Sequence, residues 1–583
     1  MMTQPTFAEN LRKIRENNHV SQRQLAYFVG VTDKVISKWE TGVSLPKADM
    51  LAQLARYFGV TADQLIGIAP PNAGNSTAPQ SPCEITLPPL PVPEPIADTN
   101  LIPDAPCWNG NYLCTWANQE IVARRLGITG EACADQRDAL TEETLFGKEN
   151  YFHPLDRTLR GDVILLLDDG WDVPFGTPHD AAHERMFGSV DPDPARFSGT
   201  TPITRLKNIV RRAADMGYAG VGLWISPQRA GIDPAEDTPA AARAYWCERA
   251  RRCFEAGIRY WKVDWGLQDN PDYRRMMTEA VRHSAPGLWI EHACGRAPIT
   301  AICGGEEMVR RYTAAAHKLL PISDVYRVYD VMPPFYTVCV MDRFDIIARQ
   351  VTTPEHGTEA LVNVESHPLI AAALGGTYGI MDYSPETAAC LRWQRIAPAF
   401  GLYTTDYHAS EKRLTDTAFF DIDPLTWVPC GGKHIEESAP AVISRGCPLP
   451  QVYKCGTYAP FVAASRHPVT GATAVAALRR TVDPNRCFVA PADITVTADP
   501  RKPIGVFGVM NSLTLELDSP LTDGFHLLAQ DLLDDSPRDI TDRVTVLTSR
   551  TVRLDGYTLR RYGKLGHAVG DTSDPTLILQ FTE

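Results

Sequence analysis

The stretch GIRYWKVDWG, residues 257–266, decides how the middle of the chain is interpreted. Residues 258–263 have the character of a buried strand, and Asp264 follows at its carboxyl end, with Lys262, Trp261 and Trp265 beside it. In a barrel of parallel strands the active site lies at the carboxyl ends of the strands, so an acid at this position points to catalysis. The structural alternative is an acid that only caps the following loop.

Strand-like and helical runs alternate on both sides of this stretch. Strands are expected over 163–171, 221–227, 258–263 and 287–295, and helices over 202–216, 239–256 and 271–283. This alternation predicts a parallel sheet wound with helices. Polar or aromatic residues follow each strand, so their side chains gather at one rim, as in a (β/α)₈ barrel. They are Asp168, Asp169, Trp171, Trp224, Lys262, Asp264, Glu291 and His292.

Acids and tryptophans around one pocket suit a sugar. Carboxylates accept hydrogen bonds from hydroxyl groups, and indole faces cover the apolar side of a sugar ring. Retaining glycoside hydrolysis needs two carboxyl groups about 5–5.5 Å apart. Asp264 is predicted to be the first, and Asp324, within KLLPISDVYRVYD (residues 318–330), is the best candidate for the second.

Five motifs between residues 107 and 330 strengthen this interpretation. They are CWNGNYLCTW, LLLDDGW, VDPDPARF with GYAGVGLWISP, YWKVDWG and PISDVY. In this order they resemble clan D of the glycoside hydrolases, the α-galactosidases and α-N-acetylgalactosaminidases of families 27 and 36. The resemblance implies that Asp264 is the nucleophile, with Lys262 a ligand beside it. It also implies that Asp168 and Asp169 bind the 4- and 6-hydroxyls of the sugar and that Trp116 and Trp224 form walls of the pocket. Trp265 is a further predicted sugar-binding residue.

The chain also departs from this family. Relatives carry an arginine shortly before the acid/base, where this sequence has Leu320, so either Arg327 or Arg311 substitutes or the subsite differs. Glu291 and His292 occur in the strand that usually recognises the 2-substituent. Galactose and N-acetylgalactosamine therefore stay equally open as the sugar.

The last part of the chain, residues 407–583, shows short alternating runs separated by Pro, Gly, Asp and Asn. This pattern predicts an antiparallel β-sandwich, which follows a barrel over 107–406. Families 27 and 36 carry such a domain after the barrel. A separate carbohydrate-binding module is the alternative.

The first 69 residues show four short amphipathic helices, with caps at Ser21, Thr32 and Thr61. The segment from Ser21 to Leu65 resembles the helix-turn-helix domains of the phage repressors, the xenobiotic-response-element type, whose second motif helix enters the major groove. The resemblance implies DNA contacts by Gln22, Thr32, Asp33, Lys34, Val35, Ser37 and Lys38. A helical bundle without DNA is the alternative.

Residues 70–106 contain eleven prolines and are predicted to be a linker. Residues 1–69 carry eight Lys or Arg against six Asp or Glu, whereas the whole chain has a net charge of −13, so any DNA contact belongs to the N-terminal domain. The 14 cysteines include no C-x-x-C pair, and no signal or membrane segment is evident, so a cytoplasmic location is expected. No cofactor is expected, and no metal either, although His179, His183 and Glu184 lie close in sequence.

The leading hypothesis is an α-galactosidase-like retaining α-glycosidase, fused to a head that binds double-stranded DNA. Asp264 would attack the anomeric carbon while Asp324 protonates the leaving oxygen and later deprotonates water. The alternative is a transcriptional regulator whose degenerate barrel senses a galactose-like sugar. The oligomeric state stays open, although a homodimer would suit the paired half-sites that such heads usually bind.

Overall fold

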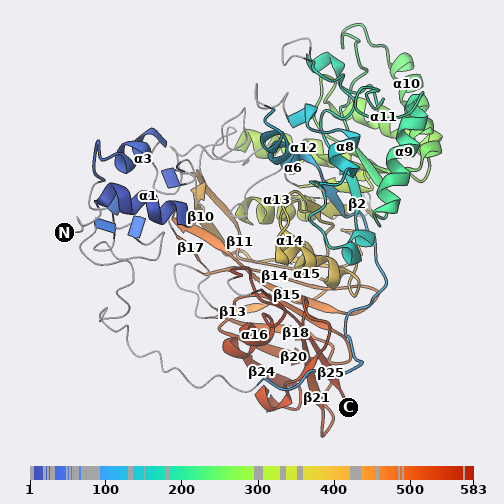
Figure 1. Cartoon of the computed structure of the whole chain (residues 1–583). Coiled ribbons are helices and arrows are strands. Elements are labelled where there is room, and N and C mark those ends of the chain that lie inside the picture. The colour runs from blue at the N-terminus through green and yellow to red at the C-terminus, as the bar shows by residue number, and fades with distance from the viewer. Residues whose placement is uncertain are drawn as a thin grey trace. The chain divides into compact units, whose positions relative to one another are not determined.

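The computed structural model describes most of the chain as two compact units, Met1–Val92 and Pro93–Glu583 (Figure 1). The described residues are 6–17, 22, 25–26, 33–46, 50–51, 54–55, 65–66, 92–128, 136–149, 151–177, 183–293, 306–328, 337–350, 359–402, 404–419, 435–453, 459–483, 486–488, 492–568 and 571–583.

The first unit is helical where it is described. Helices α1 (Phe7–Asn17) and α3 (Asp33–Glu40) share one apolar core. The core consists of Phe7, Leu11, Leu25, Ala26, Ile36, Trp39, Leu54, Ala55 and Leu65. Two of the predicted helices are therefore confirmed, while the others are described at only a few residues.

The second unit begins with a nearly closed barrel of eight parallel strands. The sheet order is β7-β6-β5-β4-β3-β2-β1-β8, and a bridge from Asn363 to Thr377 connects the two ends. The strands are β1 (Tyr112–Cys114), β2 (Ile164–Leu167), β3 (Val221–Ile225), β4 (Ile258–Val263), β5 (Trp289–Ala293), β6 (Val325–Arg327), β7 (Leu361–Asn363) and β8 (Gly379–Ile380). The expected parallel sheet is confirmed.

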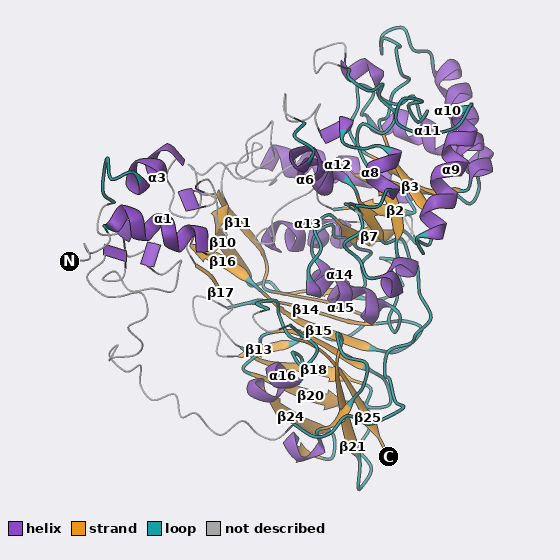
Figure 2. Cartoon of the chain, in the orientation of Figure 1, coloured by secondary structure: helices purple, strands orange, loops and turns teal. Residues whose placement is uncertain are grey.

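Helices lie around these strands (Figure 2). They are α6 (Trp116–Arg125), α8 (Glu142–Phe146), α9 (Pro202–Asp215), α10 (Pro239–Ala256), α11 (Pro271–Ser284), α12 (Glu306–Leu319), α13 (Thr337–Gln350), α14 (Pro368–Leu374) and α15 (Pro385–Gln394). Thr201, Thr238 and Asn270 cap α9, α10 and α11, each of which has a proline in its first turn. Because a cap oxygen and an N1 proline are both local signals, the sequence located these three helix starts correctly.

The last part of the chain forms β-sheets. An eight-stranded sheet contains β9 (Tyr407–Ala409), β12 (Val442–Arg445), β14 (Phe461–Arg466), β15 (Thr473–Leu478), β19 (Ile504–Gly508), β21 (His526–Asp531), β22 (Arg538–Asp539) and β25 (Thr576–Thr582). A five-stranded sheet contains β13 (Gln451–Tyr453), β18 (Asp493–Ala498), β20 (Ser512–Leu517), β23 (Thr545–Thr548) and β24 (Thr551–Asp555). Two smaller pairs are β10 (Arg413–Phe419) with β11 (Ile435–Pro440) and β16 (Arg480–Asp483) with β17 (Arg486–Phe488), and α16 spans Gly556–Tyr562.

The prediction that these strands are all antiparallel is wrong. Strand β12 pairs parallel with β14, β15 with β19, and β18 with β20. In each case the chain forms a strand of the other large sheet between the two paired strands. Such a crossover connection lets the second strand run in the same direction as the first, so the two pair in parallel. Alternation along a strand reports which face is buried but not the direction of its neighbour, so the sequence could not reveal these pairs. The sandwich arrangement itself stays a prediction.

Some residues of the predicted linker lie on this β-rich region. The Ile96 amide donates to the Pro537 carbonyl at 2.9 Å, and the Leu101 amide donates to the Gln530 side chain at 2.8 Å. Farther along, Arg395 donates to the Pro103 carbonyl at 3.2 Å. These described linker residues are therefore held on the second unit.

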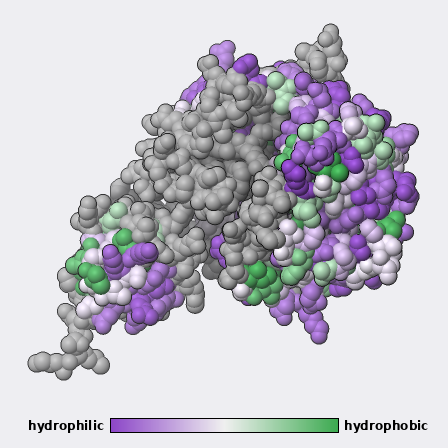
Figure 3. Space-filling view, turned by 90° about the horizontal axis from the view of Figure 1, so that it is seen from above, coloured by the Kyte–Doolittle hydropathy of each residue, from purple (hydrophilic) through white to green (hydrophobic). Residues whose placement is uncertain are grey.

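The face of the molecule in Figure 3 is mostly hydrophilic among its coloured residues, and hydrophobic residues form small separate patches. Within the described ranges, no helix is both long and apolar enough to span a membrane.

Candidate functional site

The polar site at the barrel begins with strand β4. Gly257, with a φ of 92°, ends α10 in the left-handed region that favours glycine, and the chain then enters β4. Successive side chains of a strand point to opposite faces. Tyr260 and Lys262 face the barrel interior, while Trp261 packs against Trp246 of α10 with ring centroids 5.8 Å apart. Asp264, the next residue of the inward series, therefore lies at the rim.

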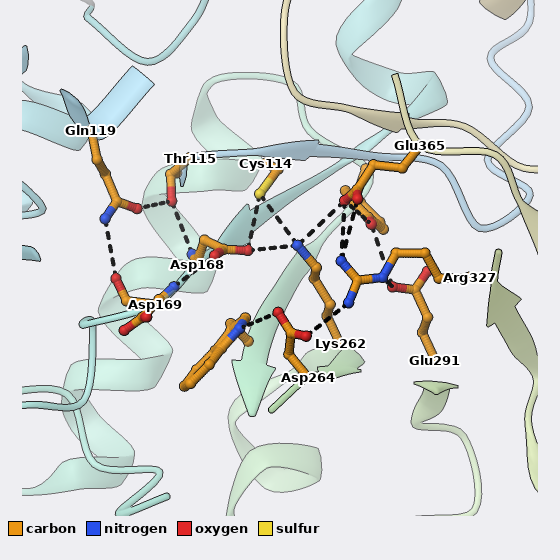
Figure 4. Close-up of polar contacts among 12 residues, drawn as sticks. Cys114, Thr115, Gln119, Asp168, Asp169, Lys262, Asp264, Glu291, Arg327 and Glu365 are labelled. Atoms are coloured by element: carbon orange, nitrogen blue, oxygen red, sulfur yellow. Dashed lines mark hydrogen bonds and ion pairs between the residues drawn. The ribbon is translucent and has the colours of Figure 1, made fainter. Parts of the chain in front are cut away.

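A line of buried charges crosses the barrel at Lys262 (Figure 4). The Lys262 ammonium lies 2.9 Å from Asp168 and 3.3 Å from Glu365. Asp168 also accepts a hydrogen bond from the Cys114 thiol at 3.0 Å, and its backbone amide donates to Thr115 at 2.9 Å. Residues that follow β2 and β7 are thereby joined through one cation from β4.

Arg327, the last residue of β6, binds three carboxylates. Its guanidinium lies 3.0 Å from Asp264, 3.3 Å from Glu365 and 3.5 Å from Glu291. The Arg327 side chain is 1% exposed. A single buried arginine thus fixes the relative positions of acids from β4, β5 and the loop after β7.

Glu291 completes the network from the interior of β5. It accepts hydrogen bonds from Tyr260 at 2.8 Å and from Asn363 at 2.7 Å. Tyr112 of β1 donates to Glu365 at 2.9 Å. Tyr260 and Asn363 donate to the Glu291 oxygen opposite the one that Arg327 contacts, whereas Tyr112 donates to the same Glu365 oxygen as Lys262. These neutral donors add hydrogen bonds to the buried carboxylates, as a buried charge requires.

Burial and neighbouring charges shift the pKa values of Lys262 and Glu291 in opposite directions. Burial alone would lower the pKa of Lys262, but Asp168 and Glu365 raise it well above its ordinary value, so Lys262 is charged. Burial raises the pKa of Glu291, and Arg327 counteracts part of that rise. The cluster is therefore a preorganised set of donors and acceptors with an excess of acids.

Asp264 is the member of this network that solvent and ligand can reach. Its side chain is 16% exposed, whereas those of Glu291 and Glu365 are fully buried. One Asp264 oxygen accepts from Arg327 and the other accepts from the Trp224 indole at 3.0 Å. The half-buried Trp265 packs edge-on against the buried Trp224, with ring centroids 5.9 Å apart, so one indole ring lies partly accessible beside this acid.

The structure does not bring Asp324 to this rim. Asp324 precedes β6, and its carboxylate accepts from the Ile290 amide at 2.7 Å and pairs with Arg282 at 3.0 Å. It therefore lies at the amino ends of the strands, opposite Asp264. The expected carboxyl pair is wrong because the chain enters β6 after Asp324 instead of ending a strand there. Asp330 is the first acid after β6 in the sequence and lies outside the described residues.

Two further expected sugar contacts point elsewhere. Asp169 forms a double hydrogen bond with Arg137, at 2.9 and 3.0 Å, so it is engaged away from Lys262. His292 lies on the outer face of β5, between Thr278 at 2.7 Å and Arg274 at 3.3 Å. Alternation along β5 explains the second correction, because Glu291 faces the interior and its neighbour must face the helices.

The other expected residues have varied positions. Trp116 begins α6 and packs partly buried against the barrel core. Arg327 is the arginine that reaches Asp264, whereas nothing is described of the Arg311 side chain. The side chains of His179, His183 and Glu184 also lie outside the described part, and within that part no group of three His, Cys, Asp or Glu is placed to bind a metal.

Sequence reasoning missed Glu365, Asn363, Tyr112 and Tyr260 as members of the network. The usable signal was alternation in residues 362–365, where Asn363 and Glu365 alternate with valines. Tyr260 alternates in the same way with Trp261 on β4. Applying period two to every strand, and not only to the strand ends, would have placed these groups inside the barrel.

In the N-terminal unit, the expected DNA-reading residues lie on α3 where they are described. Lys34 and Lys38 are exposed, Val35 and Ser37 are half-buried, and α3 begins at Asp33. Thr32 lies outside the described residues.

Gln22 is half-buried and makes a hydrogen bond within this unit. Its side-chain amide donates to Glu40 at 2.7 Å, and Glu40 also pairs with Arg15 at 2.5 Å. The hydrogen bond to Glu40 raises the pKa of Arg15. Gln22 thus stabilises the contact between α1 and α3 in this structure.

Comparisons with known proteins address the N-terminal unit. The helix-turn-helix family model matches residues 11–65. These residues form a helix-turn-helix domain. The chain is similar to the HTH-type transcriptional activator BcrR of Enterococcus faecalis, with 37% identity over 60 residues that cover 10% of this chain and 29% of the relative. It is also similar to the uncharacterized HTH-type transcriptional regulator MT0491 of Mycobacterium tuberculosis, with 44% identity over 55 residues, 9% of this chain and 39% of the relative.

Among solved structures, the P22 c2 repressor in complex with a synthetic operator is 27% identical and covers 11% of this chain and 94% of its own, with a TM-score of 0.11. A transcriptional regulator from Listeria innocua is 29% identical and covers 11% of this chain and 61% of its own, also with a TM-score of 0.11. The chain spans less than half the length of the two curated relatives above. Because these matches cover about a tenth of the chain, they give no information about the barrel.

Proposed function

We propose that this protein is a transcriptional regulator whose barrel binds a galactose-like sugar at the carboxyl ends of its strands. The observation that carries the proposal is the association, in one chain, of a helix-turn-helix domain with a rim at which the partly exposed Asp264 lies beside a buried network of ion pairs. In this proposal Lys34 and Lys38 of α3 contact operator DNA, and the sugar controls that contact.

The chemistry of the rim supports a sugar ligand. Asp264 supplies carboxylate oxygens for hydroxyl groups, and the half-buried Trp265 supplies an apolar face for the sugar ring. Arg327 and Lys262 keep the neighbouring acids fixed, so the hydrogen-bonding pattern offered to a ligand is set before binding. Preorganisation of this kind lowers the entropic cost of binding.

The second candidate is a retaining α-glycosidase with Asp264 as nucleophile, and a specific observation favours it. Asp264 lies at the end of β4 in the part of a barrel where catalytic residues usually lie, with Arg327 and Trp224 orienting it. Hydrolysis also needs a proton donor, and Asp324 lies at the other end of the strands. Asp330 is the acid that this candidate would use.

A DNA-binding titration with the full chain tests the first proposal. Duplexes selected from a random library are titrated with wild type, Asp264→Asn and Lys38→Ala, with and without millimolar galactose. Galactose should shift the dissociation constant for DNA at least about fivefold in wild type, the size of a typical coupling between sites. Asp264→Asn should bind DNA normally and lose this response, and Lys38→Ala should lose DNA affinity with sugar binding intact.

Release of nitrophenol from p-nitrophenyl α-galactoside decides between the two candidates. Turnover that both Asp264→Asn and Asp330→Asn abolish would establish the glycosidase. Absence of turnover together with calorimetric binding of galactose would support the regulator. If galactose neither binds nor alters DNA affinity, the sugar-sensing proposal is refuted.

A further inference from the structure

A cavity separate from the Asp264 network lies where the barrel meets the β-rich region. Its volume is about 380 Å³, in the range of sites for small molecules. One wall comes from the loops after β7 and β8, and the other comes from the end of β15 and residues 571–574. Figure 1 shows α14 and α15, which follow those loops, next to β14 and β15.

His367 is an unsatisfied polar group in the lining of this cavity. It is 6% exposed, and its Nε2 atom is buried without a hydrogen-bond partner in the described structure. Burial lowers the pKa of His367 to about 4, so the ring is neutral at physiological pH. A buried polar atom without a partner costs free energy that a bound ligand could recover.

The backbone beside His367 is also unusual. Ser366 has a φ of 62°, in the left-handed region that residues other than glycine seldom adopt, and its amide donates to the Gly379 carbonyl at 3.0 Å. The two loops are thereby fixed to each other at the cavity wall. Backbone strain of this kind is concentrated at ligand and active sites.

The lining is acidic. It contains Asp382, Glu386, Asp571 and Asp574, with Arg479 as the cation. Arg479 is already bound to Asp574, at 2.7–3.1 Å. Asp382 lies exposed at the cavity and makes no hydrogen bond or ion pair with the rest of the described chain. An anion would be repelled here, whereas a cation would gain a partner at Asp382.

We propose that this cavity binds a small amino alcohol or amino sugar, with its ammonium group at Asp382 and a hydroxyl group at His367. A hydroxyl group donates and accepts, so it satisfies Nε2 in either tautomer of the ring. The ammonium group offsets the acidic lining. This site shares no residue with the Asp264 network, so the inference does not depend on the function proposed for that network.

Calorimetry with two matched probes tests the proposal. Glucamine and sorbitol are acyclic and differ only in an amine, so neither presents the sugar ring that the Asp264 site would recognise. They are titrated into the full chain as wild type, Asp382→Asn, His367→Phe and Asp324→Asn. Asp324→Asn is the matched control, because it makes the same change at the opposite end of the barrel.

Glucamine should bind wild type and Asp324→Asn equally, and sorbitol should bind at least about tenfold more weakly, a difference that one charged hydrogen bond accounts for. Asp382→Asn and His367→Phe should each weaken glucamine binding by about tenfold. Because Asp382 is exposed, its variant is expected to fold and decides the test even if His367→Phe does not. The proposal is overturned if glucamine fails to bind wild type at about 20 mM, or if Asp382→Asn leaves its affinity unchanged.

Discussion

Replacing Arg327 by methionine should destabilise the barrel strongly. The arginine is 1% exposed and contacts Asp264, Glu365 and Glu291 at 3.0–3.5 Å. Methionine keeps much of the volume but leaves two fully buried carboxylates without their shared cation. Removal of one partner from a buried ion pair costs about 3–5 kcal/mol, and we expect a loss of that size in the free energy of unfolding.

Lowering the pH should restore part of this loss. Burial already raises the pKa of Glu291, and without Arg327 that pKa rises further. A carboxyl group whose pKa is higher in the folded state than in the unfolded state stabilises the fold at low pH, and this stabilisation is lost as the pH rises through the folded-state pKa. The difference between wild type and Arg327→Met should therefore be smaller at a pH of about 5 than at about 7.

Urea unfolding followed by tryptophan fluorescence measures these differences, because Trp171, Trp224, Trp246 and Trp261 are buried in the barrel. Arg282→Met is the matched control. Arg282 pairs with Asp324 at the same 3.0 Å, but its side chain is 46% exposed, and an exposed pair contributes about 0–1 kcal/mol. If Arg327→Met is no more destabilising than Arg282→Met, the barrel does not depend on the buried network and the reasoning fails.

Three further outcomes can be measured. Asp264→Asn should weaken galactose binding in calorimetry at least about tenfold, the cost of one charged hydrogen bond, whereas Asp324→Asn should not; equal effects would contradict the placement of the site at the carboxyl ends. Ile36→Ala, in the core of the helix-turn-helix domain, should cost about 2–5 kcal/mol in thermal unfolding of that domain and reduce DNA binding, with the barrel transition unchanged. Burial raises the pKa of Asp172 to about 7, so its stabilising contribution is lost as the pH rises toward that value. Asp172→Asn should therefore become more stable relative to wild type between pH values of about 5 and 8, and a constant difference would count against a buried carboxyl group.

Local sequence patterns predicted several elements of the barrel correctly. Strand β4 and helices α10 and α11 occur where the sequence predicted them, because caps, N1 prolines and apolar periodicity act over a few residues. Asp264 was correctly assigned to the end of β4 for the same reason. The helix-turn-helix domain was also identified from its sequence alone, and its family model agrees.

The partners of Asp264 required the folded chain. Asp324 directly precedes β6 and Arg327, three residues later, ends it, so the two lie at opposite ends of this short strand and a small error in the strand start reversed the assignment. Likewise, Glu365 meets Lys262 only because β7 and β4 belong to the same barrel.

The sequence by itself therefore determined the parallel alternation of strands and helices, the position of Asp264 and the identity of the N-terminal domain. Only the tertiary structure decided which acids share Arg327, which face of β5 carries Glu291 and how the strands of the C-terminal sheets pair. The physical reason is that caps and periodicity follow from neighbouring residues, whereas ion pairs and sheet order depend on segments that meet only after the chain has closed into a barrel.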